Sequence, residues 1–140
     1  MIVCVVLDKN NGMLFNSRRQ SQDKVLREHL LAECRGKLLW MNKYTSGQFE
    51  IPLSKNIIVD EEFLSKASEN DYCLVENTPL ERHINKIEKI VVFRWNKIYP
   101  ADVYFGIPLL KGNWNILSSV EFEGSSHKAI TKEVWEHEKE

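Results

Sequence analysis

The sequence predicts an α/β fold, with a mostly parallel sheet that is flanked by helices and ends in an antiparallel hairpin. Residues 2–7 form a near-continuous aliphatic run rich in valine, typical of a strand buried on both faces. Strand-like and helix-like segments then alternate along the chain, as parallel crossovers require. After Trp114 the apolar pattern becomes long and alternating, which favours paired antiparallel strands.

The N-terminal part of the chain supplies the first crossover. We expect a turn at residues 8–12, a polar loop at 13–20 and a helix at 21–34. Apolar residues recur at helical spacing through the last of these segments. Gly36 is placed to end the helix, because glycine readily adopts the left-handed conformation found after many helices.

The middle of the chain continues the alternation. We expect strands at residues 37–41 and 56–60, a short helix or loop at 42–47, and a short helix at 61–67. The first turn of the helix at 61–67 is acidic, as the helix dipole favours. These segments add strands to the parallel part of the sheet.

A further strand, helix and strand are expected at residues 72–75, 79–86 and 89–94. Thr78 and Glu81 have the spacing of a capping box, in which the threonine hydroxyl bonds an amide of the first helical turn and the glutamate bonds back. A cap of this kind contributes about 1 kcal/mol. It would also occupy the amides that a bound phosphate needs.

The C-terminal segment, residues 114–135, is expected to form an edge hairpin around the glycine-containing loop at 124–127. The pattern places one face of its first strand on alternate residues: Ile116, Ser118, Val120 and Phe122. Helix propensity is high in residues 128–140, so strand and helix both stay open for that stretch.

Composition limits the class of protein. The chain has 140 residues, of which 43% are hydrophobic, enough for one core and a single domain over 1–140. Nineteen basic and twenty acidic residues leave a formal charge of -1, which disfavours nucleic-acid binding. The N-terminus has no basic leader or cleavage site, and no apolar run has the length of a membrane span. We therefore expect a cytoplasmic protein.

Cysteine and histidine give no metal or disulfide signal. Cys4, Cys34 and Cys73 are an odd number, widely spaced, and fit buried reduced thiols. The four histidines show no HxH or HExxH spacing, so no metal site is expected. Residues 125–127, Ser-Ser-His, suggest a nucleophile and base, but adjacent residues rarely adopt triad geometry.

The order of elements resembles the dihydrofolate reductase-like fold. Asn11-Gly12-Met13 is similar to the glycine that opens the active-site loop of that family, and residues 38–45 are similar to its strand ending in Met-Gly-Arg-x-Thr. Residues 89–94 followed by 101–105 resemble a late strand and the family's Gly-Asp-Thr-x-Phe stretch. The hairpin at 114–135 fits its last two strands.

The resemblance implies both a site and a loss. Asp23 stands near the position of the family's acidic residue for the pterin ring and is the candidate catalytic residue. Burial in a cleft would raise its pKa toward a range useful for protonating a ring. As an acid in a first helical turn it also fits a simple dipole role. The family's Gly-Gly turn for the cofactor pyrophosphate is replaced by Glu76-Asn77-Thr78. A carboxylate there repels phosphate, and glycine is needed for close backbone approach. We expect no nicotinamide cofactor.

The candidate ligand-binding residues are Arg18, Arg19, Lys43, Tyr44 and Thr45. Arginine recognises phosphate and carboxylate through two parallel hydrogen bonds, so a basic loop folded toward the sheet edge would form an anion pocket. The alternative is a solvated basic loop, since exposed charges usually bind nothing specific.

Three functions follow as hypotheses. The first is binding of a small anionic or heteroaromatic ligand without an intact dinucleotide site. The second is a pterin- or flavin-type reductase that holds its cofactor in an altered pose. The third is an interaction protein whose hairpin at 114–135 pairs with a partner or with a second copy of itself, which would give a homodimer.

One further resemblance concerns two loops. Residues 18–23 and 124–127 are similar to those of small clostridial-type proteins that carry the label ribonuclease Z. An enzyme of that name needs a histidine-rich motif for two metal ions, and this sequence contains none. The label therefore adds no metal and no nucleic-acid substrate to the hypotheses.

Overall fold

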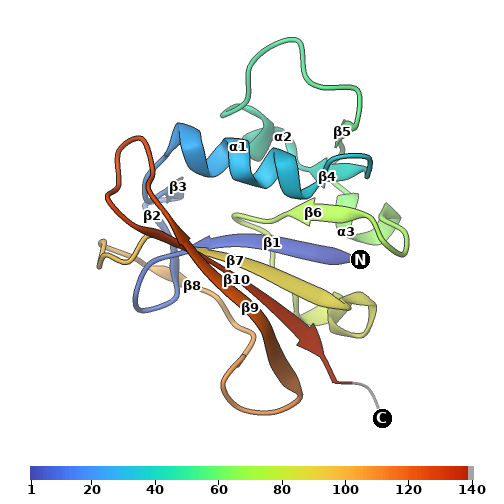
Figure 1. Ribbon diagram of the computed structural model, residues 1–140. Coiled ribbons are helices and arrows are strands. Elements are labelled where there is room, and N and C mark those ends of the chain that lie inside the picture. Colours follow the sequence, from blue (N-terminus) through green and yellow to red (C-terminus); the bar gives the residue numbers. More distant parts are fainter. Residues whose placement is uncertain (139–140) are drawn as a thin grey trace.

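The computed structural model describes residues 1–138 and is built on a seven-stranded sheet (Figure 1). The strand order is β5 (Ile57–Val59), β4 (Leu39–Met41), β6 (Tyr72–Leu74), β1 (Ile2–Leu7), β7 (Lys89–Arg94), β10 (Ile130–His137) and β9 (Trp114–Phe122). The first five run parallel, and β10 pairs antiparallel with both β7 and β9. The predicted fold class is confirmed, and β10 settles residues 130–137 as strand. Residues 139 and 140 lie outside the described part of the chain.

The helices of the structure are few and mostly short. The longest, α1 (Lys24–Glu33), covers one face of the sheet (Figure 1). The others are α2 (Lys43–Ser46), α3 (Phe63–Lys66) and the 3-10 helix η1 (Glu81–Lys86). Within residues 1–138, no helix has the length and apolar character needed to cross a membrane.

The core lies on both faces of the sheet because successive strand residues point to opposite sides. Val3 and Val5 of β1 belong to one buried cluster, and Cys4 belongs to the cluster beneath α1. All three cysteines are buried free thiols, as predicted. Burial raises the pKa of Cys73 to about 12, so this thiol stays protonated and unreactive.

A second small sheet replaces the polar loop expected at residues 13–20. It consists of β3 (Arg18–Arg19), β2 (Gly12–Phe15) and β8 (Val103–Tyr104). Asn16 and Ser17 join β2 to β3 with φ values of 51° and 61°, as a tight two-residue hairpin requires. The polar loop predicted for these residues is therefore wrong. The sequence signal for a hairpin is weak here because neither turn residue is glycine.

The boundaries of two helices also differ from expectation. The first begins after Asp23, which caps it, rather than at residue 21. The predicted capping box is wrong: η1 starts at Glu81 with Leu80 at its N-cap position and no side-chain cap. The Glu81 carboxylate turns instead toward Gly106, where an added Cβ would meet its oxygen at 2.5 Å. The absence of a side chain at Gly106 makes this contact possible.

A bulge in the C-terminal hairpin breaks the predicted alternation. The register between β9 and β10 shifts at Val134 and Trp135, so Ile116 pairs with Trp135 and Ser118 with Val134. Leu117 is therefore an extra residue in β9. Trp135 belongs to the cluster on one face and Val134 packs against the other. Ile116 thus does not share a face with the later residues, contrary to the sequence pattern.

Candidate functional site

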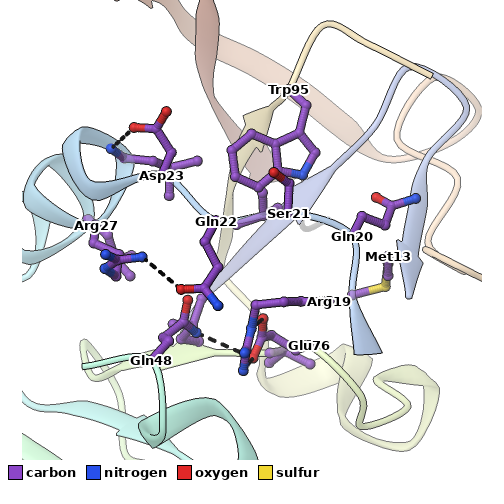
Figure 2. Close-up of a pocket in the computed structure, with 15 residues that line it drawn as sticks. Met13, Arg19, Gln20, Ser21, Gln22, Asp23, Arg27, Gln48, Glu76 and Trp95 are labelled. Carbon is purple, nitrogen blue, oxygen red and sulfur yellow. Dashed lines mark hydrogen bonds and ion pairs between the residues drawn. The ribbon is translucent and has the colours of Figure 1, made fainter. Parts of the chain in front are cut away.

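A cavity lies at the carboxyl ends of β1 and β6, where open α/β sheets bind their ligands (Figure 2). Apolar side chains from β1, α1 and β6 line it together with polar residues of the segment 19–23. Its volume is about 30 Å³. A buried water needs roughly 10–15 Å³ on this measure, so the closed cavity has room for one or two waters and not for a ring.

An ion pair between Arg19 and Glu76 lies in the lining of this cavity. The Arg19 Nε donates to Glu76 Oε2 at 2.8 Å and its Nη2 to Oε1 at 3.1 Å, which is the two-point geometry of guanidinium and carboxylate. The Gln48 amide donates to the same carboxylate at 3.3 Å (Figure 2). Arg19 and Gln48 thus both contact the Glu76 carboxylate through their side chains.

Tyr44 holds Arg19 in this position. The guanidinium carbon lies 4.5 Å from the centre of the Tyr44 ring, within cation–π range. The Tyr44 carbonyl accepts from Arg19 Nη2 at 3.2 Å, and the Tyr44 hydroxyl accepts from the Arg19 amide at 2.8 Å. The structure thus brings these two predicted ligand-binding residues together, in a contact that already satisfies the arginine.

Of the five predicted ligand-binding residues, Arg19 alone is in the lining of the cavity at the ends of β1 and β6. Arg18 is exposed and lines a second hollow, of about 510 Å³, which Arg19 also borders. Lys43 is exposed at the start of α2. Thr45 is fully buried, and its hydroxyl has no hydrogen-bond partner within residues 1–138. The five residues therefore do not converge on one closed pocket.

Asp23 is an anchor of the fold as well as a residue of the cavity lining. Its side chain accepts the Leu26 amide at 3.1 Å, the N-cap contact that starts α1. It also accepts the amides of Ser125 and Ser126 at 3.0 and 2.9 Å, which ties the hairpin loop to the helix. The loop beside the N-terminal end of α1 is visible in Figure 1.

The pKa of Asp23 moves in the direction opposite to the one expected. Burial raises it, but the hydrogen bonds from Ser126, Ser125, His127 and Leu26 outweigh that effect and hold the pKa well below the ordinary 3.8. The side chain therefore stays ionised at neutral pH. The expectation that burial would poise Asp23 as a proton donor is wrong, because its donors stabilise the charged form.

His127 completes the anchor that sequence reasoning missed. It is 4% exposed; its Nδ1 lies 3.0 Å from Asp23 Oδ2, and its Nε2 lies 2.8 Å from the Tyr99 hydroxyl and 3.4 Å from Ser21 Oγ. The Trp95 ring stacks on it at 4.3 Å. Ser126 Oγ lies 3.1 Å from Nδ1, the nitrogen that also faces Asp23, so serine and carboxylate do not sit on opposite ring nitrogens as they do in a catalytic triad.

A third cavity borders Glu76 on the side of η1. It measures about 250 Å³ and is lined by residues 76–81 and 103–106 together with Met13. Its charged lining residues within the described chain are Glu76 and Glu81, without lysine or arginine. The Glu76 carboxylate is paired with Arg19, so Glu81 supplies the net negative charge of this lining, which favours cationic or neutral groups over phosphate. Within residues 1–138, no group of three or more His, Cys, Asp or Glu side chains is arranged to hold a metal ion.

The contact between Asp23 and the hairpin loop had one signal in the sequence, the glycine at position 124. A Cβ on Gly124 would collide with the Asp23 carboxylate and with Ile130. Glycine at this position therefore lets the hairpin loop close over the start of α1. The partners of Glu76 left no comparable signal, because Arg19 precedes it by 57 positions.

No protein-family model and no curated protein matches the sequence. Among solved structures, the chain is similar to dihydrofolate reductase from Enterococcus faecalis, determined in complex with NADP(H) and RAB-propyl. The TM-score is 0.70 at 11% sequence identity, over 99% of this chain and 96% of that one. At this identity the likeness establishes the fold and no activity. The chain has a dihydrofolate reductase-like fold.

Proposed function

We propose that this chain uses the dihydrofolate reductase-like scaffold to bind a small anionic or heteroaromatic ligand beside Arg19 and Glu76, and that it has lost the dinucleotide site. The observation that carries the ligand is the exchangeable ion pair of Arg19 with Glu76 in the cavity lining. The observation that supports the loss of the dinucleotide site is the pair of carboxylates, Glu76 and Glu81, on the hollow next to η1. The resemblance implies a pyrophosphate-binding turn at residues 76–78, where a carboxylate would repel phosphate.

The ligand would bind by exchanging partners with Arg19 and Glu76. An anionic group can take the place of the Glu76 carboxylate on the guanidinium, and a ring edge with N–H donors can take the place of the guanidinium on Glu76. Gln48 offers both a donor and an acceptor next to them. Side-chain partners reorient without unfolding any backbone, so this exchange costs less than opening the Asp23 anchor.

The cavity walls suit the flat apolar body of such a ligand. Val6, Leu26 and Leu74 line the interior beside the Trp95 ring. Reorientation of the Arg19 and Glu76 side chains would enlarge the cavity while the sheet and the Asp23 anchor stay in place.

Isothermal titration calorimetry tests the proposal with defined probes. We expect saturable binding of an aromatic carboxylic acid or an aminopyrimidine by the wild-type chain. Arg19→Ala should abolish binding of the acid, and Glu76→Gln should abolish binding of the aminopyrimidine. Arg18→Ala is the matched control, because Arg18 is exposed and is not in the lining of the cavity that Arg19 and Glu76 border. Failure of both probe classes to bind would contradict the proposal.

A reductase with an altered cofactor pose is the competing function, and a kinetic assay separates it. It predicts that the chain oxidises reduced nicotinamide dinucleotide phosphate when dihydrofolate or a pterin is supplied. It also predicts loss of turnover in Glu76→Gln if that carboxylate contacts the substrate ring. Turnover above the rate of a heat-inactivated sample would replace the proposed binding function with a reductase.

A further inference from the structure

We propose that β9 is a dimerisation strand, and that it pairs antiparallel with β9 of a second copy of this chain. β9 occupies one end of the seven-stranded sheet, so the backbone groups along its outer side face no strand within residues 1–138. It spans nine residues. The opposite edge strand, β5, spans only three. A long unpaired edge is a template for adding another strand.

The exposed side chains of β9 favour a strand as its partner. Ile116, Leu117 and Val120 are 49%, 52% and 57% exposed. The bulge places Ile116 and Val120 on opposite faces of the sheet. A helix or a membrane surface would cover one face only, whereas an added strand contacts neighbours on both faces.

The charge of β9 favours its own copy over a charged peptide. Glu121 is the only charged residue in the strand, so a basic or acidic extended peptide would meet little complementary charge. Natural edge strands are usually protected by lysine, proline or short length, and β9 has neither lysine nor proline. Its one protective feature is the bulge at Leu117.

The bulge also determines where the pairing is centred. Residues 118–122 pair with β10 without interruption, so they form the regular part of the edge. A two-fold axis at Val120 places this valine opposite its own copy and Ser118 opposite Phe122 of the second copy. Glu121 then faces Ser119 rather than another glutamate, so no like charges meet. Such an isologous contact closes as a dimer and does not extend into a filament.

Analytical ultracentrifugation tests this inference on the full chain. We expect a concentration-dependent dimer for the wild type and a monomer for Val120→Lys, because the substitution places two ammonium groups opposite each other. Val103→Lys is the control: Val103 is an exposed valine on β8, outside the β9 edge, and this variant should remain dimeric. Circular dichroism should show the same fold for all three proteins.

A cysteine variant tests the position of the axis. The native cysteines are buried, so Val120→Cys introduces one accessible thiol. Oxidation should give a disulfide-linked dimer for this variant and little for Val103→Cys. A wild type that is monomeric up to its solubility limit, or a dimer that persists in Val120→Lys, would overturn the inference. A dimer lacking the Val120→Cys crosslink would overturn the proposed axis.

Discussion

Two carboxylates, Asp23 and Glu76, line the cavity at the carboxyl ends of β1 and β6, and they are held in different ways. Asp23 accepts hydrogen bonds from the backbone amides of three residues as well as from His127. Glu76 accepts only from the side chains of Arg19 and Gln48 among its described hydrogen bonds. Backbone donors move only when the chain moves, whereas side chains change rotamer. Asp23 is therefore a structural anchor, whereas Glu76 makes an exchangeable contact.

The largest expected effect comes from removing the anchor. Asp23→Ala leaves the amides of Ser125 and Ser126 and the His127 ring without their acceptor, and we expect a loss of about 3 kcal/mol or more in the free energy of unfolding. Urea denaturation measures it. Asp23→Asn retains one acceptor oxygen and should lose less. A loss below about 1 kcal/mol for the alanine variant would remove the distinction from Glu76.

The pH dependence of stability should show the same anchor. The pKa of Asp23 is lower in the folded chain than its ordinary 3.8, so its stabilising contribution is complete above that pH and is lost as the pH falls below it. One proton taken up on unfolding changes stability by up to about 1.4 kcal/mol per pH unit. Denaturation at several pH values gives the slope of the free energy of unfolding against pH. Below pH 3.8, Asp23→Asn should lower this slope by the amount that corresponds to one proton. An unchanged slope would contradict the low pKa.

The exchangeable contact should have a smaller effect on stability. We expect a coupling energy of about 1–2 kcal/mol between Arg19 and Glu76 in a double-mutant cycle with Arg19→Ala and Glu76→Ala. The pair is partly exposed, with side chains 17% and 11% accessible, which limits its strength. A coupling as large as the loss in Asp23→Ala would make Arg19 and Glu76 a second anchor and weaken the exchange proposed for the ligand.

The smallest effect is expected at Thr78. In the structure η1 has no side-chain cap, so Thr78→Ala should change the free energy of unfolding by less than about 0.5 kcal/mol. The capping box expected from the sequence would give about 1 kcal/mol. Thermal denaturation of the variant beside Pro79→Ala distinguishes the two. A loss near the larger value would restore the capping box.

The sequence predicts the regular strands well because their signal is local. The strands expected at 2–7 and 89–94 have the observed bounds, since each is a continuous aliphatic run. The β2–β3 hairpin was missed because Asn16 and Ser17 adopt positive φ without the usual glycine. The bulge at Leu117 was missed because a register shift depends on the partner strand.

The candidate site was harder to predict because its contacts are distant in sequence. Asp23 meets His127 across 104 positions, and Arg19 meets Glu76 across 57. Sequence reasoning selected Asp23 and Arg19 but paired neither with its observed partner. It also treated Glu76 only as an obstacle to phosphate, whereas the structure makes this carboxylate the partner of Arg19.

The most direct test of the proposed loss of the dinucleotide site is a calorimetric titration of the wild-type chain with reduced nicotinamide dinucleotide phosphate. We expect no saturable binding, because Glu76 and Glu81 line the hollow where the resemblance implies that the phosphates would lie. The variant Glu76→Gln/Glu81→Gln, titrated in parallel, reports whether the carboxylates alone exclude the dinucleotide. Saturable binding by the wild type would contradict the account, since the two carboxylates would then coexist with a functional cofactor site.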